Sequence, residues 1–309
     1  MKNIIYSTTL VLSSTIALGQ SITDGLLLHY RLNGDAVDQS SNGFNGVASG
    51  ATPVVDMDGN PNSAYFFDGV DDYIDLPDEP ALKPDIPFSF SYMVKFDHLN
   101  LVGSQMFTSD FEENNYHGSW TTLSADGTGR VTLSFGGGLG NTGSDNRRTK
   151  LSDVTVVTQK WYRLTFVVHG ATDMDIYIDC VDAGGTYAGT GPTEVAYSNV
   201  PGSLGRKDAH TSLPPYYFEG TLDDSAFWNR ALSQSEVVSL CAGILDVGDR
   251  LPAKQIVSVY PNPFQDRVNF KFSNPEKEAH FLKLFDASGR EIRKTLSVRS
   301  ELIELKRMI

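Results

Sequence analysis

Apolar and polar residues alternate along two segments of the chain, residues 88–96 and 130–135. Residues 161–168 and 173–180 form two further apolar-rich segments of similar length. Because strand side chains point alternately to opposite faces, this pattern predicts β-strands with one buried face. Turns rich in Gly, Asn and Asp separate these segments. The body of the chain is therefore predicted to be an all-β sandwich or jelly roll.

One short helix is predicted after residue 233. Ser233 and Glu236 have the spacing of a capping box, in which each residue satisfies a free backbone N–H of the other. Val237, Val238 and Leu240 follow as the apolar side of this helix.

An acidic turn at residues 68–72 lies between two short apolar runs, residues 64–67 and 73–76. Glycine permits the tight turn, and aspartates bond back to their own backbone in such turns. The pattern predicts a β-hairpin or a bend in one strand.

The character of the chain changes near residue 245. Residues 245–255 are predicted to be an exposed linker. Residues 256–309 then form a second β-rich unit, in which residues 286–289 (Asp-Ala-Ser-Gly) join two alternating strands.

The N-terminus has the features of a secretory signal peptide, assigned to residues 1–19. Lys2 supplies the positive end, and an apolar stretch runs from Ile4 to Leu18. Ala17 and Gly19 are small residues at the two cleavage subsites, and cleavage after Gln20 is the near alternative. No later segment approaches the ~20 apolar residues that a membrane helix requires. The sequence thus predicts an exported protein without a transmembrane span.

Charge and cysteine content narrow the possible functions. The net charge is −13 and the sequence pI is about 4.8, which argues against nucleic acid as a partner because its backbone needs a basic surface. Ordinary solubility and divalent cation binding both remain open as reasons for the acidity. Cys180 and Cys241 are the only cysteines. In an oxidising compartment they are compatible with one disulfide, and two buried thiols are the alternative.

Three stretches together resemble a known family. Residues 25–43, the acidic turn with its flanks at residues 64–76, and residues 218–233 have the order and spacing of the laminin-G-like, concanavalin A-like jelly-roll family. The resemblance covers residues 22–243 and implies a jelly roll, which we assign to residues 20–244.

The second unit resembles the C-terminal sorting domain of the type IX secretion system of Bacteroidetes-type bacteria. The match is carried by Tyr260-Pro261-Asn262-Pro263 and by the Asp-x-x-Gly-Arg turn that ends at Arg290. The family implies a small immunoglobulin-like sandwich that the outer-membrane export machinery recognises and that is usually removed. The protein is then secreted or anchored to the outer surface of a Gram-negative cell. The sequence ends at Ile309 without the family's last Gly-x-Tyr strand, so we expect an incomplete sorting domain.

The jelly-roll resemblance also implies a structural Ca²⁺. Ca²⁺ takes six to eight oxygen ligands from carboxylates, amides and backbone carbonyls. The residues at the family's positions are Asp38, Asn42, the carbonyl of Gly69, and Asp223. The alternative is that these residues cap turns without a metal.

Catalytic patterns are absent from the sequence. Glycoside-cleaving jelly rolls carry Glu-x-Asp-x-x-Glu on one strand, and this chain lacks that motif. Asp173, Asp175 and Asp179 are predicted to share the solvent face of an amphipathic strand. Neither His-Glu-x-x-His nor Gly-x-Ser-x-Gly occurs. We therefore expect a non-catalytic binding protein. Two alternatives remain: a polysaccharide hydrolase or lyase, and a structural surface protein that binds other proteins.

Glycan binding requires aromatic rings beside polar groups. The ligand-binding candidates lie in two groups, Tyr116, His117 and Trp120 in one loop and Tyr216 and Tyr217 in another. The sequence leaves open whether Trp120 belongs to the core or to a ligand surface.

Overall fold

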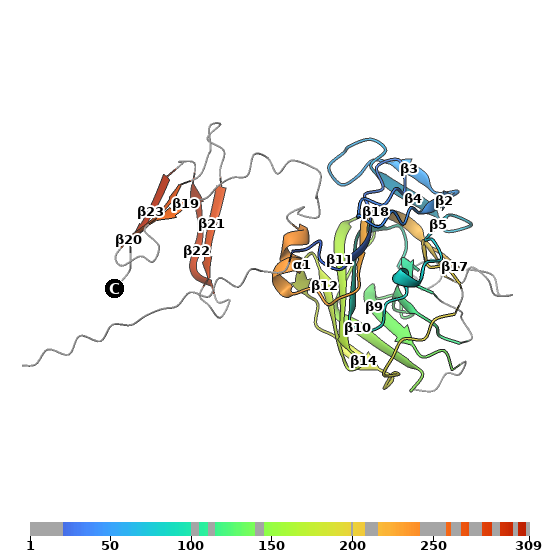
Figure 1. Ribbon diagram of the computed structural model, residues 1–309. Helices are drawn as coiled ribbons and strands as arrows, with labels where there is room; N and C mark the ends of the chain where they lie inside the picture. The colour runs from blue at the N-terminus through green and yellow to red at the C-terminus, as the bar shows by residue number, and fades with distance from the viewer. Residues whose placement is uncertain are drawn as a thin grey trace, which may run out of the picture. The chain divides into compact units, whose positions relative to one another are not determined.

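The computed structural model describes residues 21–99, 105–110, 115–139, 145–198, 200–207 and 216–241, together with five strands between residues 258 and 306. The chain divides into two compact units, residues 1–245 and 246–309 (Figure 1). The predicted signal peptide, residues 1–19, and the whole of the predicted linker, residues 245–255, lie outside the described residues.

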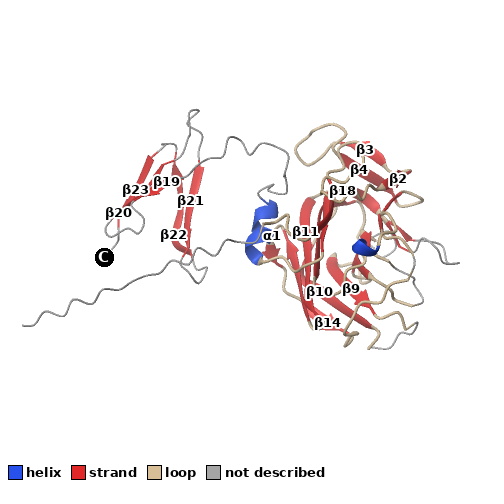
Figure 2. Cartoon of the chain, viewed as in Figure 1, coloured by secondary structure: helices blue, strands red, loops and turns tan. Residues whose placement is uncertain are grey.

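The first unit is built from two antiparallel sheets (Figure 2). In spatial order the first sheet contains β13 (Val181–Asp182), β12 (Asp173–Ile178), β11 (Trp161–Gly170), β6 (Phe88–Phe96), β18 (Glu219–Trp228), β4 (Ala64–Asp68) and β3 (Thr52–Val54), and β1 (Leu26–Tyr30) also pairs with β18. The second sheet contains β14 (Thr186–Ala188), β10 (Arg147–Thr155), β9 (Arg130–Gly136), β8 (Ser119–Leu123), β7 (Phe107–Thr108), β15 (Ser203–Leu204), β5 (Tyr73–Asp75) and β2 (Val47–Ser49).

Three smaller elements complete this unit. A short ribbon joins β16 (Arg206–Lys207) to β17 (Tyr216–Tyr217), a single 3₁₀ turn covers Pro80–Leu82, and α1 spans Gln234–Cys241. The all-β prediction for the body of the chain is confirmed.

The core lies between the two sheets and is rich in aromatic rings. The alternate residues of β6, from Phe88 to Phe96, are at most 1% exposed, as the period-two pattern predicts. Phe90 of the first sheet contacts Phe107 of the second, with ring centroids 4.4 Å apart, and Phe227 of β18, at 5.1 Å. Such pairs add about 0.5–1.5 kcal/mol each beyond the apolar area that they bury.

Two local predictions differ from the structure. The acidic turn at residues 68–72 joins β4 of the first sheet to β5 of the second, so the hairpin alternative is wrong, and the chain bends here from one sheet into the other. The strand predicted over residues 173–180 ends at Ile178. Asp179 and Cys180 turn away because both have positive φ, +51° and +62°.

Helix α1 begins as the capping box predicts. The Ser233 backbone N–H donates to the Glu236 carboxylate at 2.8 Å, and the Glu236 N–H lies 3.4 Å from the Ser233 hydroxyl oxygen. The buried face of α1 packs on the outer side of the first sheet. The buried residues of this contact form a second apolar cluster, separate from the core between the sheets. It consists of Leu26, Val167, Tyr177, Cys180, Ala226, Trp228, Leu232, Val237 and Leu240.

The predicted disulfide between Cys180 and Cys241 is confirmed. Its Cα atoms are 6.2 Å apart, which is within the range of unstrained bridges. The bond ties the end of α1 to the turn after β12. Helix α1 is the last described element of the first unit, so the disulfide fixes that unit's C-terminal end to its sheet.

A buried ionic cluster lies on the outer side of the first sheet, next to the area that α1 covers. Asp224 accepts hydrogen bonds from Arg163 and from the His29 ring, the latter at 2.6 Å. Burial alone would raise the pKa of Asp224, but Arg163 and His29 outweigh it and hold that pKa well below its usual range. Asp224 has φ +43° and lies in the β-bulge where β18 loses register with β6.

The second unit has two antiparallel sheets. One contains β19 (Ser258–Tyr260), β20 (Arg267–Lys271) and β23 (Leu302–Lys306), and the other pairs β21 (His280–Phe285) with β22 (Glu291–Val298). The predicted turn at residues 286–289 lies outside the described residues. Across the described parts of both units, no helix has the length and apolar character needed to cross a membrane.

Removal of the disulfide is expected to lower the free energy of unfolding by about 4 kcal/mol, because the bond closes a long loop in the unfolded chain. Its two cysteines are 61 positions apart in the sequence. The measurement is urea unfolding of the oxidised protein and of the Cys180→Ala/Cys241→Ala variant. Equal stabilities, or two titratable thiols per chain in the denatured unreduced protein, would contradict the prediction.

Candidate functional site

A continuous row of residues crosses the outer face of the second sheet. Core residues such as Leu133, Phe135 and Leu204 point inward, so the residues that alternate with them point outward. Strand register places one outward residue from each of eight strands side by side. From β2 to β14 the row is Val47, Asp75, Ser203, Thr108, Trp120, Ser134, Thr149 and Ala188.

The middle of this row is buried and its β10–β14 end is open. Thr108, Ser203 and Ser134 are at most 3% exposed, and Trp120 is 6% exposed. Thr149 is half-buried, and Ala188 is exposed. A ligand on this face can therefore reach the end formed by β10 and β14, or the end at β2, where Val47 is exposed, but not the centre.

An aromatic and cationic stack borders the open end. The rings of Tyr116 and Trp120 are stacked with centroids 6.0 Å apart. The guanidinium of Arg147, at the start of β10, lies 5.1 Å from the centroid of the Tyr116 ring. Thr149 lies two residues from Arg147 on the same side of the strand, and its hydroxyl is 2.8 Å from that of Ser134. We call Tyr116, Trp120, Arg147 and Thr149 the open-end site.

The structure brings together only some of the predicted glycan-binding residues. Tyr116 and Trp120 contact each other, and Trp120 serves mainly as the buried base of the stack. His117 packs against Gly138, where a Cβ would lie only 2.6 Å from the His117 Nε2 atom. Tyr216 and Tyr217 form β17, which pairs with β16 and not with the strands that carry Trp120 and Arg147.

A second arginine–tyrosine pair lies toward the other end of the row. The Arg206 guanidinium is 3.4 Å from the Tyr73 ring centroid and bonds the carboxylate of Asp75. Sequence patterns gave no reason to select Arg147, Arg206 or Tyr73. Each becomes a neighbour of this face only through strand pairing, which none of the predicted strand segments indicated.

Two of the residues predicted to bind Ca²⁺ make hydrogen bonds to nearby groups of the protein. The Asp38 carboxylate accepts hydrogen bonds from three backbone N–H groups, of His29, Ser40 and Phe44, and from the Ser40 hydroxyl. The amide nitrogen of Asn42 donates to two carbonyls of β1. These contacts match the turn-capping alternative for both residues.

Gly69 and Asp223 lie at different positions along β18. Gly69 is next to Glu219 at the start of the strand, and Asp223 lies four residues further on. Burial and the negative charge of Asp224 raise the pKa of Asp223 to about 8.

The structure also gathers an acidic cluster at the bend between the sheets. Asp68, Asp71 and Asp72 each offer an oxygen, and these oxygens all lie within 4.8 Å of one another. Asp68 and Asp71 are exposed, whereas Asp72 is buried and accepts the backbone N–H of Asp68 at 2.9 Å. Burial raises the pKa of Asp72. Gly69 belongs to the same bend, so one predicted ligand lies within this cluster.

The aspartates near β12 have separate environments. Asp175 bonds the His169 ring at 2.9 Å and lies 3.4 Å from the Lys150 amine. Asp179 is in the turn after the strand, where its carboxylate accepts the Arg163 backbone N–H. Asp179 therefore does not share the strand face with Asp173 and Asp175 as the sequence predicted.

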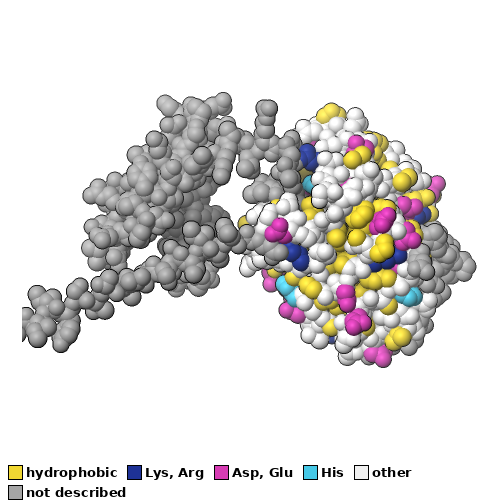
Figure 3. Space-filling view, viewed as in Figure 1, with side chains coloured by type: hydrophobic (Ala, Val, Ile, Leu, Met, Phe, Trp, Pro, Cys, Tyr) yellow, Lys and Arg dark blue, Asp and Glu magenta, His cyan; other side chains and the backbone are white. Residues whose placement is uncertain are grey.

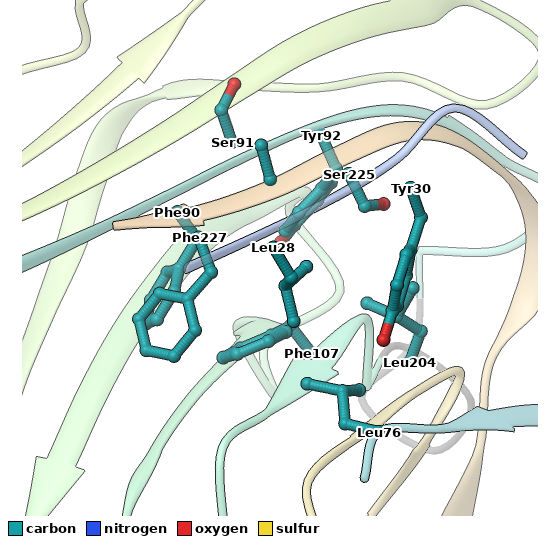
Figure 4. Close-up of a pocket in the computed structure, with 11 residues that line it drawn as sticks. Leu28, Tyr30, Leu76, Phe90, Ser91, Tyr92, Phe107, Leu204, Ser225 and Phe227 are labelled. Atoms are coloured by element: carbon teal, nitrogen blue, oxygen red, sulfur yellow. The ribbon is translucent and has the colours of Figure 1, made fainter. Parts of the chain in front are cut away.

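An internal cavity between the sheets offers no ligand site. It holds about 10 Å³, room for one water molecule, and its lining is mostly apolar (Figure 4). Ser225 points toward it, and the Ser225 hydroxyl is buried without a hydrogen-bond partner. On the face of the first unit seen in Figure 3, acidic side chains are interspersed with apolar and basic ones.

Comparison with known proteins identifies the two units. The family model described as the concanavalin A-like lectin/glucanases superfamily matches residues 67–238, and the secretion system C-terminal sorting domain matches residues 258–306. A search of curated proteins found no match.

Solved structures share the fold at low identity. Domain 4 of AbnA, an extracellular arabinanase from Geobacillus stearothermophilus solved in complex with arabinotriose, is 22% identical, and the match covers 70% of this chain and 98% of that domain at a TM-score of 0.49. The binding domain of botulinum neurotoxin serotype D is 14% identical, with 82% of this chain and 62% of that chain covered and a TM-score of 0.53. The serotype G binding domain is 11% identical, and the match covers 86% of this chain and 64% of that chain at a TM-score of 0.51. The chain thus spans less than two thirds of either toxin domain.

These identities establish the fold alone. The first family model, in contrast, matches more than half of the 309-residue chain. The chain belongs to the concanavalin A-like lectin/glucanase superfamily and carries a secretion-system C-terminal sorting domain after its jelly roll.

Proposed function

We propose that this protein is an exported, non-catalytic binding protein that recognises a glycan at the bacterial cell surface or outside the cell. The open-end site carries the proposal. It places a tyrosine ring, a guanidinium and a hydroxyl at an accessible end of a sheet face whose middle is buried.

The chemistry of this site suits a sugar. Aromatic side chains offer a rigid apolar surface, and hydroxyl and guanidinium groups supply hydrogen bonds in fixed directions. Trp120 is buried beneath Tyr116, so the stack is held in place before any ligand arrives. A pre-organised surface binds with a smaller loss of conformational entropy.

A non-catalytic role is supported by the state of the carboxylates. Asp175 and Asp224 are engaged by His169 and Arg163 respectively, and Asp38 by its own loop. None of the three belongs to the open-end site. A hydrolase would need two carboxyl groups about 5–10 Å apart across a bound sugar.

The sorting domain supports export by the type IX machinery, followed by secretion or anchoring at the outer surface of a Gram-negative cell. The two compact units suggest that the jelly roll does not need the sorting unit in order to fold.

A structural Ca²⁺ is proposed at the bend between the sheets. Carboxylate and carbonyl oxygens are the ligands that Ca²⁺ prefers. The cluster of Asp68, Asp71 and Asp72 contains three carboxylates, and Gly69 belongs to the same bend. Asp38, Asn42 and Asp223 remain predicted ligands on the family resemblance alone.

The glycan prediction is tested with Tyr116→Ala. Loss of the ring should weaken binding of any glycan found on an array by tenfold or more, since a stacked aromatic contact is worth about 1–3 kcal/mol. The control is Tyr187→Ala, because Tyr187 also stacks with an arginine but alternates with Ala188 of the row, so its side chain lies on the opposite side of β14. Calorimetry with each variant, after a check of its melting temperature, gives the answer. Equal weakening by both variants, or by neither, would contradict the site.

Deletion of residues 246–309 is expected to block export and to leave the jelly roll folded. In a host with the type IX exporter, the shortened chain should accumulate in the periplasm with an unchanged melting transition. The measurement is surface labelling and fractionation alongside the 309-residue chain. If the shortened chain reached the surface, the assigned role of the second unit would be wrong.

Calcium at the acidic bend is expected to raise the melting temperature. Binding to the native state alone stabilises it by about 2.7 kcal/mol when free Ca²⁺ is 100 times its Kd. That corresponds to about 5–10 °C for a domain of this size. Asp71→Asn should reduce the shift, and an unchanged melting temperature of the wild type in calcium and in chelator would exclude the site.

The Asp223→Asn variant tests whether Ca²⁺ binds at Asp223, as the sequence predicts, or only at the acidic bend. The pKa of Asp223 is raised to about 8, so between about pH 4 and pH 8 the folded state holds a proton that the unfolded chain releases. Stability from this group therefore falls as the pH rises. Without a metal at Asp223, the variant should melt higher than the wild type at pH 8 and equally at pH 4. If Ca²⁺ binds Asp223, the variant should instead melt lower at pH 8 in calcium.

A further inference from the structure

We propose that the glycan is anionic, and that the Arg147 guanidinium receives its carboxylate or sulfate group. This inference rests on the proposed glycan-binding function and adds the class of ligand. The open-end site contains one charged side chain, that of Arg147.

The guanidinium is held in place from one side. It lies 5.1 Å from the Tyr116 centroid, and Tyr116 in turn stacks on Trp120 at an interplanar angle of 21°. Trp120 is 6% exposed, whereas Arg147 is exposed. A planar cation on a fixed ring loses little freedom when its outward edge meets an anion. The stack thus presents two parallel N–H donors, which match a carboxylate or a sulfate.

Arg147 differs from three other arginines of the first unit in charge compensation. Arg163, Arg206 and Arg230 each pair with a carboxylate. Arg148, the next residue of β10, donates to the Gly189 carbonyl and stacks on Tyr187. Within the ranges that the structure describes, no carboxylate lies within ion-pair distance of Arg147. An arginine without a carboxylate partner among the described residues, on a protein of net charge −13, is a local site for an external anion.

The same net charge limits the kind of anion. A chain with dense negative charge would be repelled by the rest of the protein before it reached Arg147. A mostly neutral glycan with separate acidic groups avoids this repulsion. Its neutral residues can contact the ring of Tyr116 and the hydroxyl of Thr149, which lies on the same side of β10 as Arg147.

Calorimetry with matched ligands tests the inference on the full chain. The carboxylate probe is an otherwise neutral oligosaccharide that carries a single uronic acid residue, and its control is the same oligosaccharide with that carboxyl group reduced to an alcohol. The sulfate probe is an otherwise neutral oligosaccharide that carries a single sulfate ester, and its control is the desulfated form. The variants are Arg147→Gln and, as the matched control, Arg148→Gln on the opposite side of the same strand.

We expect one acidic probe to bind at least tenfold more tightly than its neutral control, because hydrogen bonds to a charged group are worth about 1.5–3 kcal/mol. Arg147→Gln should remove this preference, and Arg148→Gln should keep it. The probe that binds identifies the anionic group as carboxylate or sulfate.

Three results would overturn the inference. If neutral and acidic forms bound equally, or if Arg147→Gln left the preference intact, glycan binding would stand but the anionic class would be wrong. If neither an acidic nor a neutral oligomer bound, and the glycan array was also negative, the proposed function would fail together with this inference. Melting temperatures of both variants show whether a loss comes from unfolding.

Discussion

The layer of aromatic rings between the two sheets is the constraint on which the rest of the first unit depends. Phe90 contacts Phe107 from the opposite sheet and Phe227 from the neighbouring strand. Because these rings must face inward, strand alternation forces every second residue outward. The outward row on the second sheet is therefore a consequence of core packing. A shift of one residue in β8 would turn Thr121 and Leu123 outward, turn Trp120 into the core and so remove it from the open-end site.

The two outer faces of the sandwich have different roles. On the first sheet, α1 and the Cys180–Cys241 disulfide cover an apolar area, and the ionic cluster of Asp224, Arg163 and His29 occupies the polar area next to it. These contacts stabilise the sheet and engage its charged groups. On the second sheet, the β10–β14 end of the outer face keeps an exposed arginine and a half-buried tyrosine and threonine. This division is the reason that we place ligand binding on the second sheet.

Much of the fold could be predicted from sequence because its signals are local. Period-two alternation located β6 and β9, and the Ser233–Glu236 pair located the start of α1. The bend at residues 68–72 was harder, since a turn sequence does not show whether the strands beside it share a sheet. Likewise, the amphipathic pattern extended β12 to Cys180, although the chain turns at Asp179 with positive φ.

The candidate site was less predictable, because its residues meet only through strand pairing. Tyr116 and Trp120 were selected as aromatic loop residues, but Arg147 comes from β10, two strands away from β8. For calcium, residue type alone could not show that the Asp38 carboxylate accepts hydrogen bonds from nearby backbone N–H groups. Nor could it show that Asp68, Asp71 and Asp72 gather at one bend.

Hydrogen–deuterium exchange of the full chain, with and without a bound oligosaccharide, tests most directly that ligand binds at the open end of the second sheet. The account predicts that added protection is confined to residues 115–123 and 147–151. Added protection on the outer face of the first sheet, around Met93, Arg163 and Asp223, with none at Arg147, would contradict it.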